Sequence, residues 1–103
     1  MDKLIKDGKV AIIYSHDYGG GWSTWNGYNE EMIFDPVIAQ AIIDEKTEAE
    51  IYDIAVERYP EAYHGGANSL KVLWVEKDTL FRVTEYDGAE GIEVFTEESY
   101  YRA

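Results

Sequence analysis

Cysteine is absent from the 103 residues, which excludes disulfides and thiolate metal sites and suits a reducing compartment. Basic residues are scarce: nine Lys and Arg stand against 21 Asp and Glu, for a net charge of −12. This acidity opposes direct binding to nucleic acid, which needs clustered cations. No apolar segment approaches the length of a membrane span, and the N-terminal stretch has no run of signal-peptide length. We therefore expect a cytoplasmic protein without membrane or direct nucleic-acid partners.

The length of the chain fits one domain over residues 1–103, and its hydrophobic content of 46% is ordinary for a globular protein. Aromatic residues make up 15%, an excess that often lines pockets or interfaces. The acid is uneven, because Glu30 to Glu61 holds ten acidic and two basic residues. Such a balance usually reflects solubility. Less often it marks a protein that docks a basic surface or mimics nucleic acid.

The hydrophobic pattern predicts strands at both ends of the chain. Lys9 to Ser15 contains an unbroken apolar run, typical of a strand covered on both faces. It follows Asp7-Gly8, a hairpin dipeptide, so Leu4 and Ile5 are expected to form a short partner strand. Later apolar runs, separated by turn residues, predict strands at Leu70–Val75, Leu80–Tyr86 and Gly91–Phe95. The tail, Thr96 to Ala103, is a candidate extra strand.

Two helices are predicted between these strands. Asp35-Pro36 is a typical N-cap followed by the first helical residue, which favours a helix from Pro36 to Glu45. Thr47 and Glu50 fit a capping box, so a second helix is expected from Glu48 to Tyr59. The fold class is therefore α+β: a mostly antiparallel sheet, made of the N-terminal strand and a C-terminal three-stranded meander, with two helices packed on one face.

The stretch from Tyr14 to Asn26 is the main candidate site. It places three glycines and two tryptophans directly after the buried strand. Glycine backbones leave N–H groups open to an anion, and indole rings stack on flat ligands. The alternative is that the tryptophans fill the end of the sheet and the glycines make room for them. The stretch does not match a known nucleotide-binding motif. A G-x-G-x-x-G pattern that begins at Gly19 would need glycine at residue 24, which is threonine.

Other polar residues give weaker signals. Ser15-His16-Asp17 contains the residue types of a catalytic triad, but adjacent residues do not reach triad geometry. His16 and His64 are the only histidines and show no metal-ligand spacing, so no metal and no cofactor are expected. The loop at His64 is predicted to face the first glycine loop. Arg82 is expected to pair with Glu85 or Glu93, or else to bind a ligand phosphate.

The sequence also resembles a family of small proteins from tailed bacteriophages and prophage-bearing bacteria. The resemblance rests on the strand Val10–Ser15, the loop Gly19–Asn26, Phe34-Asp35-Pro36 and the segment Phe81–Glu90. It implies a phage context, in which small acidic proteins often counter host defences. Some are oligomeric sponges that sequester nucleotide signals, and others block nucleases with acidic surfaces.

Three functional hypotheses follow. The first is a non-enzymatic, counter-defence protein that sequesters a nucleotide-like small molecule, as a homo-oligomer if it resembles a sponge. The second is an acidic inhibitor or nucleic-acid mimic that docks a basic host protein through Glu48, Asp53 and Glu57. The third is a small enzyme that degrades a nucleotide signal. The ligand-binding residues of the first hypothesis are Tyr14, Ser15, Gly19, Gly20, Gly21, Trp22, Thr24, Trp25, Asn26, His64 and Arg82.

Overall fold

The computed structural model describes residues 2–95, and the predicted strand in the tail lies outside them. The fold is α+β, as predicted. Its elements are β1 (Ile5–Lys6), β2 (Lys9–Ser15), a 3₁₀ turn (Thr24–Asn26), α1 (Glu30–Phe34), α2 (Pro36–Ile43), α3 (Glu48–Arg58), β3 (Leu70–Glu76), β4 (Leu80–Tyr86) and β5 (Ala89–Phe95).

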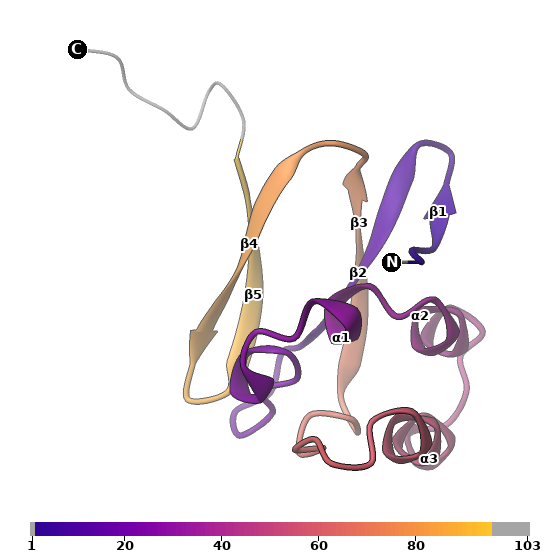
Figure 1. The fold of residues 1–103 in the computed structure, drawn as a ribbon, viewed down its shortest axis with the longest axis vertical. Coiled ribbons are helices and arrows are strands. Elements are labelled where there is room, and N and C mark those ends of the chain that lie inside the picture. Colours follow the sequence, from indigo (N-terminus) through magenta and orange to yellow (C-terminus); the bar gives the residue numbers. More distant parts are fainter. Residues whose placement is uncertain (1, 96–103) are drawn as a thin grey trace.

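Strand β2 is the centre of the molecule, because its two faces belong to two different cores. Ala11 and Ile13 face a cluster that includes residues of α2 and α3. Val10 and Ile12 face a second cluster formed with α1, β3 and the β4–β5 hairpin. Figure 1 shows the hairpin on one side of β2 and β3, and α2 and α3 on the other. The unbroken apolar run of β2 thus has the cover on both faces that its sequence predicts.

The strands form two antiparallel sheets, whereas a single sheet that joined the N-terminal strand to a three-stranded meander was expected. One sheet has the order β1-β2-β3 and the other contains β4 and β5. The turn after Glu76 carries the chain from β3 to β4 without pairing them, and the hairpin packs across β2 instead. The hairpin thereby covers the face of β2 that carries Val10 and Ile12, which pairing with β3 alone would leave exposed.

The predicted caps start both longer helices. The Asp35 carboxylate accepts hydrogen bonds from the backbone N–H groups of Val37 (2.9 Å) and Ile38 (3.1 Å). The Thr47 hydroxyl accepts one from the N–H of Glu50 (3.1 Å) and donates to its carboxylate (3.0 Å). These bonds satisfy N–H groups that the first turn of a helix leaves unpaired.

Two hairpins share the same turn chemistry. Asp7-Gly8 joins β1 to β2, and Asp87-Gly88 joins β4 to β5. Both residues of each turn have positive φ, at 53° and 76° in the first and 49° and 83° in the second. This is the type I′ geometry that suits the twist of two-residue hairpins.

Candidate functional site

The glycine loop is fastened to the turn of the β4–β5 hairpin. The N–H of Gly19 donates to the carbonyl of Asp87 at 2.6 Å, and the N–H of Gly21 donates to the carbonyl of Gly88 at 2.7 Å. The N–H of Gly20 is also occupied, by the carbonyl of Asp17. The N–H groups of all three glycines therefore already donate to carbonyls of the protein. The predicted anion-binding backbone is not open in this structure.

A buried carboxylate also holds the loop in place through hydrogen bonds. Glu90 is 5% exposed. Its Oε1 accepts a hydrogen bond from the N–H of Ser15 at 3.0 Å, and its Oε2 accepts from the N–H (2.9 Å) and hydroxyl (2.7 Å) of Thr24. Ser15 and Thr24 are themselves buried. These two predicted ligand-binding residues thus hold Glu90, which is not among the predicted site residues.

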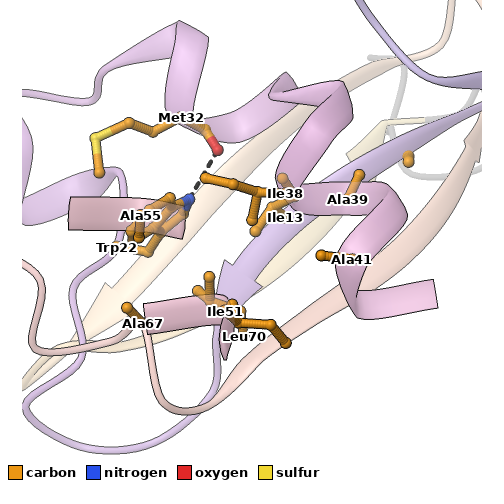
Figure 2. Close-up of a cluster of buried hydrophobic side chains, with 11 residues drawn as sticks. Ile13, Trp22, Met32, Ile38, Ala39, Ala41, Ile51, Ala55, Ala67 and Leu70 are labelled. Carbon is orange, nitrogen blue, oxygen red and sulfur yellow. Dashed lines mark hydrogen bonds between the residues drawn. The ribbon is translucent and has the colours of Figure 1, made fainter. Parts of the chain in front are cut away.

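Trp22 belongs to the core. Its side chain is completely buried, and its indole N–H donates to the carbonyl of Met32 at 2.7 Å. Figure 2 shows the indole nitrogen directed at this oxygen, among the side chains of the first core cluster. The predicted stacking surface of Trp22 is therefore closed to ligand in this structure, which agrees with the alternative reading of that residue.

Trp25 has the opposite environment. It is 45% exposed, its ring centroid lies 5.5 Å from that of the equally exposed Tyr63, and its indole N–H donates to Glu85 at 3.2 Å. The indole also lies directly over Gly21, where an added Cβ would meet it at 2.2 Å. Gly21 therefore leaves space for the Trp25 side chain. Of the two tryptophans, only Trp25 has a ring that is partly exposed to solvent.

The first glycine loop also contacts the segment around the second one. The Asn26 side chain exchanges two hydrogen bonds with the backbone of Tyr63, at 2.8 and 3.0 Å. Gly66 lies against Ser15 and Gly20, so the second glycine loop does face the first, as predicted. His64 is turned away from this contact, with its ring beside Tyr52 and Nε2 against the carbonyl of Tyr59.

Besides Ser15, two predicted site residues lie on strands. Tyr14 is half-buried on β2, opposite Lys71 of β3. Arg82 is exposed on β4 and pairs with Glu93 of β5 at 2.7 Å, one of the two carboxylates expected for it. Arg82 also lines an open groove of about 570 Å³ between α1 and the edge of β4. Apolar side chains of both elements line this groove, and Tyr28, Glu30 and Glu85 add polar groups.

A second buried carboxylate has a structural role. Asp35 is 2% exposed, and its Oδ2 accepts hydrogen bonds from Arg58 Nε (2.7 Å) and the Tyr59 hydroxyl (2.6 Å). The hydrogen bond to Asp35 raises the pKa of Arg58. Burial raises the pKa of Tyr59, and the hydrogen bond to Asp35 raises it further. The cluster ties the start of α2 to the end of α3.

The exposed face of α3 is acidic and carries few counter-charges. Glu48, Asp53 and Glu57 are all exposed and have no ion pair within residues 2–95, whereas Glu50 pairs with Lys46 at 3.8 Å. An open hollow of about 510 Å³ lies beside this face. Its lining residues are Glu48, Ala49, Tyr52, Asp53 and Asn68.

The described residues contain no group of three or more His, Asp or Glu side chains placed to hold a metal ion. Over the same part of the chain, no helix has the length and apolarity needed to cross a membrane. The fold defines a small α+β protein with two antiparallel sheets. Comparisons with protein-family profiles, with curated proteins and with solved structures find no match.

Proposed function

We propose that this protein is a non-enzymatic binding module that docks a basic protein surface through the acidic face of α3. The observation that carries the proposal is the hollow at Tyr52, where the carboxylates of Glu48 and Asp53 flank an exposed ring. Carboxylates attract Lys and Arg, and an aromatic face attracts the same cations through its quadrupole. The site therefore fits an Arg or Lys side chain better than an anion.

The charge of the whole chain supports the same partner. A net charge of −12 repels phosphate groups and accelerates the approach of a basic protein. The glycine N–H groups, which would favour an anionic ligand, are already donated within the protein. The phage resemblance stays a prediction, and with it the expectation that the basic partner is a host protein in the host cytoplasm.

Charge reversal on α3 tests the proposal, with an oligo-arginine peptide as the probe in a titration. We expect Glu48→Lys and Asp53→Lys to weaken binding more than Glu76→Lys, which makes the same change in net charge at the exposed end of β3. Wild-type binding should also fall steeply with salt, because such attraction is screened within about 8–10 Å near physiological ionic strength. Equal losses in all three variants would show general charge attraction and contradict a site on α3.

A flat-ring ligand at Trp25 is a second candidate, supported by its half-exposed indole beside Tyr63. A stacked base is worth about 1–3 kcal/mol on an aromatic side chain. Calorimetry with cyclic dinucleotides and ADP-ribose derivatives tests it, because Trp25→Ala should abolish binding that Tyr14→Ala leaves intact. Absence of binding by the wild-type protein removes this candidate, and turnover of the ligand would indicate an enzyme instead.

A further inference from the structure

We propose that two copies of this chain associate by antiparallel pairing of their β4 strands about Val83. Strand β4 has one partner, β5, and no other segment of residues 2–95 pairs with its outer edge. The edge is seven residues long and regular, since its register with β5 runs without a bulge from Leu80 to Tyr86. It also lacks proline and lysine, which commonly protect such edges from pairing.

The hairpin geometry determines which backbone groups point outward. Tyr86 and Ala89 flank the two-residue turn and therefore form a hydrogen-bonded pair. Hydrogen-bonded pairs alternate along an antiparallel ladder, so even-numbered residues of β4 are bonded to β5. The N–H and C=O groups of Phe81, Val83 and Glu85 thus face away from it.

These outward groups are arranged symmetrically about Val83. In an antiparallel pair of β4 strands centred there, Val83 lies opposite Val83 of the second copy, and Phe81 lies opposite Glu85. Every hydrogen-bonded pair of this register, Phe81 with Glu85 and Val83 with Val83, joins residues whose N–H and C=O groups point outward, and the pairs between them are non-hydrogen-bonded. The ladder therefore forms without breaking any hydrogen bond of the existing hairpin.

The side chains of the solvent face are symmetric in the same way. Leu80 and Tyr86 are among the most exposed large hydrophobic residues described, at 74% and 70%. They lie three positions on either side of Val83 and on the same face of the strand, so the proposed register places each opposite the other. Cross-strand apolar pairs of this kind stabilise sheets.

Charge and shape favour a second copy as the occupant. Strand β4 holds one Arg and one Glu, so it is neutral within a chain of net charge −12. Each Arg82 is already paired with Glu93, so the two arginines near the symmetry axis bring little repulsion. The groove beside the edge is lined by Ile33 and Phe34 of α1 and gives room to apolar side chains of the added strand.

The free edge of β3 does not have this symmetry. Pairing two β3 strands about their central residue, Leu73, would place Leu70 opposite Glu76 and Lys71 opposite Val75. Apolar side chains would then face charged ones in four of the pairs. Strand β4 also lies across the three-stranded sheet from α3 (Figure 1), so a β4 dimer leaves both acidic faces accessible and is independent of the function proposed for them.

Sedimentation equilibrium of the full chain tests the proposal, with an expected mass of twice 11.8 kDa. The double variant Leu80→Glu with Tyr86→Glu places like charges opposite each other twice, and the dimer should dissociate at least about tenfold more readily. Leu80→Lys with Tyr86→Glu places opposite charges there and should restore association. Tyr18→Ala controls for loss of the Tyr18–Tyr86 ring contact and should leave the dimer intact.

Salt distinguishes this association from docking of a basic partner. Two chains of like charge repel each other, so self-association should strengthen as salt rises. Circular dichroism of each variant verifies that the monomer is folded. A wild-type protein that stays monomeric at its highest soluble concentration overturns the proposal. A dimer that responds equally to both double variants, or to neither, also overturns it.

Discussion

The Oε2 atom of Glu90 lies 2.9 Å from the backbone nitrogen of Thr24 and 2.7 Å from its hydroxyl oxygen. A residue of the last described strand therefore fixes the loop that follows β2. Glu90 is buried, and its donors come from the main chain as well as from a side chain. The carboxylate thus supplies the hydrogen-bond acceptor for the buried backbone N–H groups of Ser15 and Thr24.

Glu90→Gln should destabilise the fold. An amide keeps the size of the side chain, but its NH₂ group must face the N–H of Ser15 or the two donors of Thr24. A buried donor left without an acceptor costs about 1–3 kcal/mol. Urea denaturation measures this loss, and Glu93→Gln on the same strand is the control. Glu93 is about half exposed in a surface ion pair, so its loss should cost at most about 1 kcal/mol.

The twin hairpin turns provide a second test. Gly8→Ala and Gly88→Ala both force an L-residue into positive φ, at a cost of about 1–2 kcal/mol each. A Cβ at Gly8 meets no atom within 4 Å, whereas one at Gly88 meets the backbone nitrogens of Gly20 and Gly19 at 2.7 and 2.8 Å. Gly88→Ala should therefore be the more damaging by at least about 1 kcal/mol. Equal thermal midpoints would contradict the close contact between loop and turn.

The two tryptophans should respond differently to the same substitution. Trp22→Phe removes the donor to the Met32 carbonyl and leaves space in the core, so it should cost at least about 1–3 kcal/mol. Trp25→Phe changes an exposed ring and should stay within about 0.5 kcal/mol. Chemical denaturation of both variants gives the comparison. If Trp25→Phe were the more destabilising, the assignment of Trp22 to the core would be wrong.

Alkaline pH should weaken the fold through Tyr59. Burial and the bond to Asp35 raise its pKa in the folded state. Above the ordinary tyrosine pKa of about 10, the unfolded chain has lost a proton that the folded chain retains, so the free energy of unfolding falls as pH rises. Tyr59→Phe should reduce this fall above about pH 10, whereas the exposed Tyr52→Phe should not. Identical pH profiles in the two variants would contradict the role of Tyr59.

Local signals were sufficient to predict the strands and the two longer helices of this fold, but not α1 or the 3₁₀ turn. The boundaries of β2 and β4 match the apolar runs, and both helices begin at their predicted N-caps. These features depend on residues a few positions apart. The separation of β4–β5 from the other sheet was not predicted, because it depends on which face of β2 the hairpin covers.

The environment of the tryptophans also lay beyond the sequence. Trp22 and Trp25 are three residues apart in the same glycine-rich stretch, yet one is buried and the other is half exposed. The difference arises from partners far along the chain, Met32 for the first and Tyr63 and Glu85 for the second. Composition predicted both tryptophans as ligand-binding residues and did not separate the exposed Trp25 from the buried Trp22. The burial of Glu90 was not predicted, because no local pattern distinguishes this glutamate from the many exposed acidic residues.

The bond from Ser15 to Glu90 spans 75 residues, which has a consequence for synthesis of the protein. During translation, the segment after β2 emerges well before its acceptors at residues 87–90. Contacts so distant in sequence close slowly, because the intervening chain must be ordered first. A ribosome-bound fragment ending before Asp87 should therefore leave its glycine-rich segment sensitive to protease, and a chain that extends through β5 should protect it.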